Sequence, residues 1–257
     1  MDIVLPKLDP KKETERISEF FRKTLAEQNI QHVVIGVSGG IDSTTSLLLL
    51  KKSLKPEQII AVHLPYETDD QDALKLLENS GLPESNRPII SIQSAVRAFE
   101  ETLVITKGQT DQMRLGNIMA RVRMIMLFDL AKQHNALVCG TENRSEHLLG
   151  YFTRFGDAAS DIEPIQHLYK TQIFQLAKHL GVPEKILHKQ PSANLWHNQT
   201  DEKEFGFSYQ EADQVLYLYF DKQQSIEQIK QNDFPNADKI IALAGKNIFK
   251  HKTPYSL

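Results

Sequence analysis

Short runs of aliphatic and β-branched residues alternate with longer amphipathic segments along most of the chain. The runs at 33–37, 59–64, 88–92 and 136–141 have the continuous apolar character of buried parallel strands. The segments between them repeat apolar residues every three or four positions, which predicts helices. This alternation predicts an α/β fold, a Rossmann-like, doubly wound parallel sheet with helices on both faces.

The amphipathic segments give the boundaries of the expected helices. In the first part of the chain they span 11–29, 42–52, 69–80, 94–103, 113–134 and 142–149. After Gly150 the pattern becomes irregular up to Asp161, as in loops that carry function. Further helices are expected at 168–180, 208–220, 225–231 and 237–249. We therefore expect a single domain over residues 1–257 with a helical C-terminal extension.

Composition narrows the class of protein. The 257 residues include 30 basic and 33 acidic side chains, and the net charge of -3 argues against a general nucleic-acid or membrane-surface binder. No apolar run approaches a membrane span, and the first residues lack the regions of a secretory signal. The single cysteine, Cys139, excludes an internal disulfide and is expected to be an inert core residue. A cytoplasmic protein is expected.

The turn after the first predicted strand is the most informative motif. Residues 36–43 read Gly-Val-Ser-Gly-Gly-Ile-Asp-Ser and lead directly into a helix. Two glycines allow a tight bend and a close ligand, and the N-terminus of the helix favours a phosphate. The Asp42 carboxylate would repel that phosphate unless a cation such as Mg²⁺ lies between them. The turn lacks the Walker pattern, and an ordinary capped strand–helix turn is the alternative interpretation.

Two further residues extend this hypothesis. Glu146 lies near the start of the helix that follows the strand at 136–141. Ligands bind beyond the carboxyl ends of parallel strands, so Glu146 is expected opposite Asp42 as a second metal ligand. A solvated helix glutamate is the alternative. Lys170 also begins a helix, where the dipole disfavours a cation unless it reaches phosphate oxygens.

Aromatic and charged residues alternate in the irregular stretch after the fourth strand. The rings of Tyr151 and Phe152 suit stacking on a heteroaromatic base, and Arg154 suits a phosphate or carboxylate. Core packing is the alternative for the rings. Asp157 and Asp161 could orient ribose hydroxyls or an amine, or could be turn residues.

Other polar side chains are candidates for substrate contact. Arg121 and Arg123 are two positions apart on a largely apolar helix, so they face different directions. One is expected to contact substrate and the other to pair structurally. Ser192 could donate a hydroxyl.

The turn at 36–43 resembles the pyrophosphate loop of N-type ATP pyrophosphatases. From about residue 15 onward the chain also resembles NAD synthetases, in which further blocks occur in the same order. These blocks are Gly116-Asn117, Ala120–Met124, Gly140–Glu146, Gly150–Asp157, Pro191–Ala193, Leu195-Trp196 and Gln199–Glu202. The resemblance implies an adenine nucleotide alpha hydrolase-like fold and an ammonia-dependent ligase.

The resemblance implies a two-step reaction. ATP, a co-substrate, adenylates the carboxylate of deamido-NAD (nicotinic acid adenine dinucleotide) and releases pyrophosphate. Ammonia then displaces AMP to give the amide, NAD. Mg²⁺ is the implied metal, and a homodimer whose long central helices pair is the implied assembly. The apolar stretch Met113–Phe128 suits such an interface. We expect no glutaminase domain, and therefore free ammonia or ammonia from a separate partner.

The resemblance also implies roles for individual residues. ATP contacts are implied for Gly36, Val37, Ser38, Gly39, Gly40, Ile41, Asp42, Ser43, Thr141, Lys170 and Ser192. Deamido-NAD contacts are implied for Arg121, Tyr151, Phe152, Arg154, Asp157, Asp161, His251 and Lys252. Asp42 and Glu146 are the implied metal ligands, and together with Lys170 and Asp157 they form the implied catalytic set.

The chain departs from the family pattern at four positions. Arg154 replaces a frequent Lys, Ser192 a frequent Thr, Met119 a common Lys, and Thr253 the usual Arg. These changes affect single contacts and leave the implied reaction class unchanged.

Two other kinds of function remain open at this point: another enzyme of the same superfamily, either an amidase or a tRNA-thiolating enzyme, and a non-catalytic nucleotide sensor. A related amidase of the GMP synthetase kind should carry xanthine-nucleotide contacts and a separate dimerisation module. A tRNA-thiolating enzyme should carry catalytic cysteines or a basic RNA-binding domain, and the sequence has neither. A non-catalytic nucleotide sensor should have lost Asp42 or Glu146, and both are present.

Overall fold

The computed structural model describes the chain from residue 5 to residue 256 with short gaps. The described ranges are 5–67, 70–107, 111–193, 195–196 and 199–256. Within them the central element is a parallel sheet of three strands in the order β2-β1-β3. The strands are β1 (His32–Gly36), β2 (Ile59–Val62) and β3 (Ala136–Cys139).

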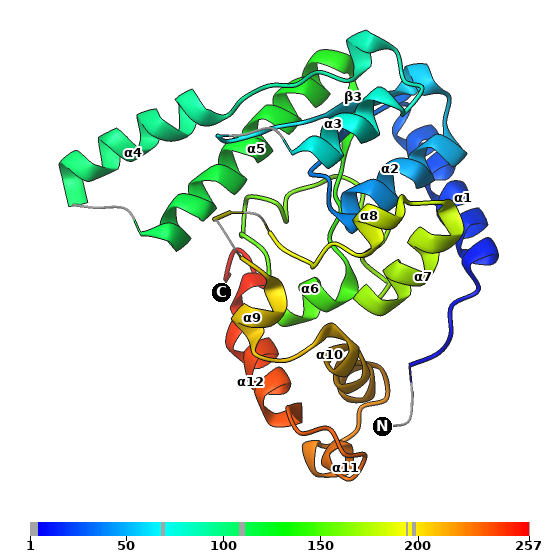
Figure 1. Ribbon diagram of the computed structural model, residues 1–257, viewed down its shortest axis with the longest axis vertical. Coiled ribbons are helices and arrows are strands. Elements are labelled where there is room, and N and C mark those ends of the chain that lie inside the picture. The colour runs from blue at the N-terminus through cyan, green and yellow to red at the C-terminus, as the bar shows by residue number, and fades with distance from the viewer. Residues whose placement is uncertain (1–4, 68–69, 108–110, 194, 197–198, 257) are drawn as a thin grey trace.

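Helices cover both faces of the sheet and continue as a bundle below it (Figure 1). They are α1 (Pro10–Gln28), α2 (Ile41–Ser53), α3 (Gln71–Glu78), α4 (Gln93–Lys107), α5 (Gln112–His134), α6 (Arg144–Leu149), α7 (Lys170–Leu180), α8 (Glu184–Leu187), α9 (Asp201–Phe205), α10 (Tyr209–Leu216), α11 (Ile226–Lys230) and α12 (Ala237–Asn247). The predicted α/β class and the helical C-terminal extension are therefore confirmed. Among the described helices, none is long and apolar enough to cross a membrane.

The alternation of side chains along β1 divides the core into two layers. Val33 and Ile35 are fully buried in the layer that contains residues of α1, α2 and α7. Val34 points to the other face, where residues of α5 such as Met119 and Val122 cover it. Successive residues of a strand face opposite sides, so every position of a doubly covered strand must be apolar. This explains the continuous apolar run that predicted the strand.

The C-terminal helices build a core of their own. Its residues come from α6, α9, α10, α11 and α12, and include Leu149, Phe205, Val215 and Ile240. The bundle packs against α6 and α7 and so lies beside the edge of the sheet where the strands end (Figure 1).

The prediction of a strand over residues 88–92 is wrong in extent. Here the chain forms one isolated bridge, between His63 and Ile89, although Ile90 N also donates to His63 O at 2.9 Å. Pro88 has no N–H to donate, and Pro65 interrupts the neighbouring segment, so a continuous ladder does not form. Ile89 is 53% exposed, and the apolar run therefore lies at the margin of the sheet.

Other boundaries differ from the expected ones by a few residues. Asp69, where the sequence begins a helix, lies outside the described residues, and α3 begins at Gln71. The expected helix at 208–220 ends as a π-helical turn over Tyr217–Asp221. The short helix α8 was not expected, since four residues are too few for a periodic signal.

Two neighbouring aromatic residues on α1 give a direct test of this packing. Phe21 is 0% exposed in the layer beneath the sheet, whereas Phe20 is 42% exposed. Phe21→Ala should lower the free energy of unfolding by roughly 3–5 kcal/mol, because it leaves a cavity in the core. Phe20→Ala, the matched control, should cost less than about 1 kcal/mol. Urea denaturation measures both, and equal losses would contradict this placement of α1.

Candidate active site

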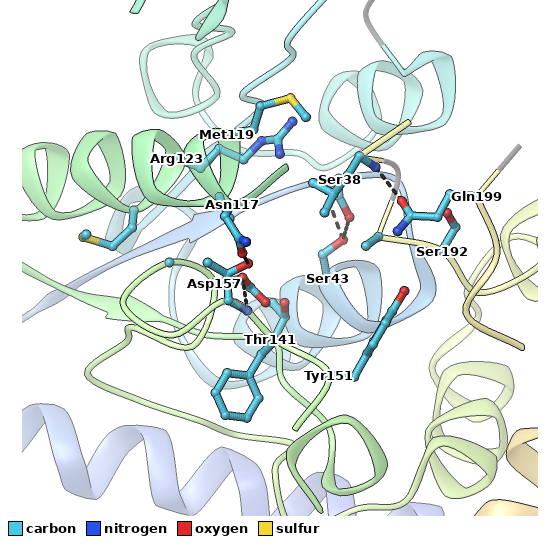
Figure 2. A pocket seen from close by; sticks show the side chains of 18 of the residues that line it. Ser38, Ser43, Asn117, Met119, Arg123, Thr141, Tyr151, Asp157, Ser192 and Gln199 are labelled. Atoms are coloured by element: carbon cyan, nitrogen blue, oxygen red, sulfur yellow. Dashed lines mark hydrogen bonds between the residues drawn. The ribbon is translucent and has the colours of Figure 1, made fainter. Parts of the chain in front are cut away.

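A large cleft opens at the carboxyl ends of the strands, where β1 lies between its two neighbours. Its volume is about 1420 Å³, above the roughly 300–1,000 Å³ of ordinary small-molecule sites, so it can hold more than one nucleotide-sized ligand. The lining comes from the turn after β1, from β2 and β3, from α5 and from segments near 150–157 and 192–207. Figure 2 shows Ser38 and Ser43 facing this space. This is the switch point of the sheet, where strand order reverses.

The turn at 36–43 is a preformed loop. Ser43 Oγ accepts from Ser38 N at 3.3 Å, and Ser38 Oγ accepts from Gly40 N at 3.3 Å. Gly39 has a φ of +77°, and a Cβ there would lie 2.5 Å from Asp70 Oδ1. Gly40 is the N-cap residue of α2. No side chain caps the first N–H groups of this helix. The loop therefore has the form of an anion-binding turn.

Three charged side chains meet beside this loop. Lys170 Nζ lies 2.6 Å from Asp42 Oδ2 and 3.0 Å from Glu146 Oε1. The lysine side chain is 2% exposed, and each carboxylate is 17% exposed. Because one ammonium contacts both acids, Asp42 and Glu146 face each other across a gap the size of one cation. The sequence placed these three residues in one site, and the structure brings them together.

Local capping interactions hold the three groups in place. Asn143 caps α6 by accepting from Glu146 N at 3.0 Å, and Glu146 Oε2 accepts from Asn143 N at 3.3 Å. The same Asn143 donates its amide to Asp42 Oδ1 at 3.0 Å. This reciprocal capping box fixes both the start of the helix and the direction of the Glu146 carboxylate. Asn143 therefore orients both acids.

A buried carboxylate from the C-terminal bundle helps to hold the same charged cluster in position. Asp213 on α10 accepts from Ser145 Oγ and, at 2.8 Å, from Thr171 N. Ser145 Oγ also accepts from Lys170 N at 2.9 Å. Asp213 thus supports the first turns of α6 and α7, which carry Glu146 and Lys170. Burial raises the pKa of Asp213 to about 6.

Burial and mutual charge shift the protonation of these groups. Burial raises the pKa of Glu146; the Lys170 ammonium opposes this rise and the Asp42 carboxylate adds to it. Burial alone would lower the pKa of Lys170, but the carboxylates of Asp42 and Glu146 outweigh it and the pKa rises. Lys170 is therefore a permanent cation in this site. Asp42, Glu146 and Lys170 are not among the residues that line the cleft, but they lie beside the turn whose Ser38 and Ser43 line it. A cluster of groups with perturbed pKa values next to a cleft is typical of functional sites.

The aromatic loop borders the other side of the cleft. Tyr151 donates to Glu204 Oε2 at 3.2 Å, and its ring lies edge-on to Phe205 with centroids 4.6 Å apart. The Phe152 ring lies 5.2 Å from Lys250 Nζ, which donates to the Phe152 carbonyl at 2.8 Å. Both rings line the cleft and also pack locally. The binding and the core-packing interpretations are therefore compatible.

Asp157 and the expected arginines also line the cleft. Asp157 accepts from Thr153 N at 2.9 Å, and burial raises its pKa. Arg121 is exposed and donates to the Arg154 carbonyl at 3.3 Å. Arg123 donates through Nε to Leu64 O at 3.0 Å, so it joins α5 to the end of β2. Both arginines therefore line the cleft and donate to a backbone carbonyl, and the expected division into one substrate contact and one structural contact stays a prediction.

The remaining expected contacts divide into two groups. Thr141 and Ser192 line the cleft (Figure 2). Asp161, His251 and Lys252 are not among its lining residues. Asp161 Oδ2 accepts from Val138 N at 2.8 Å, and the His251 ring packs on that of His147 with centroids 4.4 Å apart. The implied substrate contacts of all these residues, those that line the cleft included, remain predictions.

Three acids near the cleft interact through their charges: Glu142, which is buried, Glu163, which is half-buried, and Asp157, which is exposed. Glu163 accepts from Ser160 Oγ at 2.7 Å and from Glu142 N at 3.2 Å. A Cβ on Gly140 would lie 1.8 Å from Glu163 Oε1, so only glycine leaves room for this acid. Burial raises the pKa of Glu163 to about 8.

Sequence reasoning missed two residues next to the charged cluster. Asp201 on α9 is 2% exposed, and its Oδ2 accepts from Tyr209 OH at 2.9 Å. The Tyr209 ring in turn lies 5.2 Å from Lys170 Nζ. Asp201 follows Thr200 at the start of a helix, so its sequence pattern is that of an ordinary cap. The sequence itself holds no signal for its burial.

The fold and the site define a class: a nucleotide-binding α/β protein of the adenine nucleotide alpha hydrolase fold. The model of the family described as NAD synthase matches residues 13–254. The chain therefore belongs to the NAD synthase family.

Individual proteins agree with this assignment. The curated NH(3)-dependent NAD(+) synthetase of Thermoplasma acidophilum is 43% identical over 253 residues, which cover 97% of this chain and 98% of that protein. A structure of NMN synthetase from Francisella tularensis matches with a TM-score of 0.83 and 35% identity, covering 98% of this chain and 99% of the other. The NH3-dependent NAD synthetase from Campylobacter jejuni matches with a TM-score of 0.75 and 34% identity, covering 97% and 100%.

The raised pKa of Glu163 predicts a pH dependence of stability. A carboxyl group whose pKa is higher in the folded than in the unfolded protein stabilises the fold at low pH, and this stabilisation is lost as pH rises towards about 8. Glu163→Gln stays neutral, and its amide can donate to Ser160 and accept from Glu142 N. The wild-type free energy of unfolding should therefore fall more steeply than that of the variant between about pH 5 and pH 8. Parallel curves from urea titrations at several pH values would contradict this.

Proposed function

We propose that this protein catalyses the ATP-dependent amidation of deamido-NAD to NAD with ammonia. The observation that carries the proposal is the pair Asp42 and Glu146 facing one cation position beside an anion-binding turn. Family membership and near-complete coverage of a curated ammonia-dependent NAD synthetase support the same reaction. The deamido-NAD carboxylate is a poor acyl donor, so it must first be activated by a nucleotide.

The turn after β1 is the proposed phosphate site. Its preformed serine and backbone contacts place N–H and hydroxyl groups beside the cleft, and Lys170 adds a buried positive charge next to them. Thr141 and Ser192 line the same space and are proposed to complete the ATP contacts. These groups would hold the triphosphate while the substrate carboxylate attacks the α-phosphorus and pyrophosphate leaves.

The two acids fit a magnesium ion. Asp42 and Glu146 already converge on a cation, the Lys170 ammonium, and oxygen donors are the ligands that Mg²⁺ prefers. Among the described residues no group of three or more His, Cys, Asp or Glu side chains is placed to share a metal, so phosphate and water oxygens would complete the coordination. When bound, the metal would neutralise charge on the phosphates and on the departing pyrophosphate.

The aromatic side of the cleft is the proposed pyridine-nucleotide site. Tyr151 and Phe152 offer rings, and the cations of Arg121 and Arg154 offer charge to phosphates. Asp157 would lie near the carbonyl that ammonia attacks, where a carboxylate attracts an amine. Attack of the ammonia nitrogen on the acyl carbon expels AMP, and the nitrogen loses a proton. This balances the reaction as amide plus AMP.

Ammonia is the proposed nitrogen donor, and residues 1–257 are proposed to act as one synthetase domain. Support comes from the Thermoplasma relative, 98% of which this chain covers and whose printed name specifies NH(3). The cytoplasmic location expected from the sequence stays a prediction.

Amidation of the mononucleotide is a second candidate. The NMN synthetase structure matches with a higher TM-score, 0.83, than the NAD synthetase structure, 0.75. The corresponding acid, nicotinic acid mononucleotide, presents the same carboxylate without the adenylate half. The substrate assay must therefore compare both acids.

The central test is an assay with each acid, ATP, Mg²⁺ and an ammonium salt, in which the amide and AMP are followed together. Deamido-NAD should give NAD and AMP in equal amounts, and replacing ammonium by glutamine should stop the reaction. Preferential use of the mononucleotide would select the second candidate. AMP formation without any amide product would contradict both candidate functions.

Asp42 gives the sharpest variant. Asp42→Asn keeps the size of the side chain but removes its charge, and turnover should fall by at least about 100-fold. Asp238→Asn, an exposed acid on α12, should retain wild-type turnover and so serves as the matched control. Undiminished turnover in the Asp42 variant would refute its metal role. Circular dichroism confirms that both variants fold.

We also propose that two copies of the chain pair through α4 and α5. Figure 1 shows these helices extending away from the body of the molecule. They carry large apolar side chains that are about half exposed, namely Phe99 (50%), Met113 (57%) and Ile125 (51%). Exposed apolar residues on projecting helices are typical of an interface, and like surfaces pair in a symmetric dimer.

Sedimentation equilibrium tests this assembly. The wild-type protein should sediment as a dimer, and Ile125→Glu should shift it towards the monomer because the charge would be buried at the interface. Lys132→Glu, an exposed change near the end of the same helix, should leave the dimer intact. A monomeric wild-type protein would contradict the proposal.

A further inference from the structure

The proposed contact of Lys170 with ATP does not explain why its ammonium lies between two carboxylates. Two ionised carboxylates that face each other repel, and a positive charge between them removes this repulsion. In the structure this charge is the Lys170 ammonium, at 2.6 Å from Asp42 and 3.0 Å from Glu146. A metal ion bound by both acids would need this same place. The lysine and the metal therefore compete for one position.

A third acid makes the surroundings of this position more negative. Asp201 is 2% exposed, and its Oδ1 is buried without a hydrogen-bond partner among the described residues. Its other oxygen accepts from Tyr209 OH, and the Tyr209 ring lies 5.2 Å from Lys170 Nζ. The Lys170 ammonium thus contacts two carboxylates, and the charge of Asp201 acts on it in addition. A divalent cation matches this excess of negative charge better than a single ammonium does.

We propose that Lys170 is the resident cation of this site when no nucleotide is bound. A divalent metal replaces it between Asp42 and Glu146 once ATP phosphates offer the ammonium another partner, and the charge of Asp201 favours this exchange. The inference rests on the proposed function, since it takes Asp42 and Glu146 as the metal ligands.

The exchange makes metal and nucleotide binding interdependent. If a metal entered without nucleotide, a buried ammonium would lose both of its carboxylate partners, and an unpaired buried charge is costly. With ATP present the ammonium turns to phosphate oxygens, and the cost disappears. Each ligand therefore raises the affinity of the other by the same factor.

Manganese is a suitable probe because its bound and free forms differ in electron paramagnetic resonance. The full-length wild-type protein should bind Mn²⁺ at least about ten-fold more weakly without a non-hydrolysable ATP analogue than with it. Lys170→Met removes the competing charge but keeps a long side chain. This variant should bind Mn²⁺ without nucleotide at least about ten-fold more tightly than the wild type. Lys178→Met, an exposed change on the same helix, should match the wild type.

Asp201 has a separate test. Asp201→Asn keeps an oxygen that can accept from Tyr209 but removes the charge. In the presence of the ATP analogue it should bind Mn²⁺ about three- to ten-fold more weakly than the wild type. Asp238→Asn should show no change. An unaltered affinity in the Asp201 variant would overturn its part of the proposal.

The main proposal fails if Lys170→Met binds Mn²⁺ without nucleotide no better than the wild type does. Should that variant be unstable, millimolar Mn²⁺ should raise its melting temperature, whereas Mn²⁺ alone should leave the wild-type value unchanged. A variant that Mn²⁺ does not stabilise would also overturn the proposal. These measurements use no deamido-NAD, so their outcome is separate from that of the amidation assay.

Discussion

The contact of the Lys170 ammonium with the carboxylates of Asp42 and Glu146 joins the first turns of three helices, α7, α2 and α6. The positive ends of three helix dipoles therefore point at one place, which favours anions there. Asp42 and Glu146 place two acidic side chains here, and the Lys170 ammonium balances part of their charge. An anionic ligand and two acids can share such a site because cations lie between them. The rest of the fold brings these three helix starts together.

The C-terminal bundle takes part in that task. Asp213 reaches from α10 to Ser145 and to the backbone of Thr171, so it supports the helix starts that carry the acid and the lysine. Asp201 adds charge from α9. The extension is therefore part of the site, although its helices do not cover the sheet. Its own apolar core gives these carboxylates a fixed position from which to act.

The sequence predicted those parts of the structure that depend on local pattern or on topology. The strands β1, β2 and β3 are buried on both faces and so appear as apolar runs. Asp42 and Glu146 follow two of these strands, and parallel strands bring their carboxyl ends to one edge. The segment 88–92 has the same apolar signal, but its Pro88 and the Pro65 of the neighbouring segment prevent a continuous ladder. The burial of Asp201 depends on packing between distant segments, which the sequence pattern around it does not encode.

The support that Asp213 gives has a consequence for how this fold could be rearranged. The sheet and the turn after β1 lie in the first part of the chain and could be mistaken for a unit that is independent of the C-terminal helices. Yet the hydroxyl of Ser145, which receives the backbone of Lys170, is itself oriented by a carboxylate some forty positions beyond that lysine. A recombinant protein that joined the sheet to an unrelated C-terminal segment would lack this carboxylate, and Lys170 would lose the support that Ser145 gives it. The charged cluster therefore depends on the sheet region and the C-terminal helices being present together in one chain.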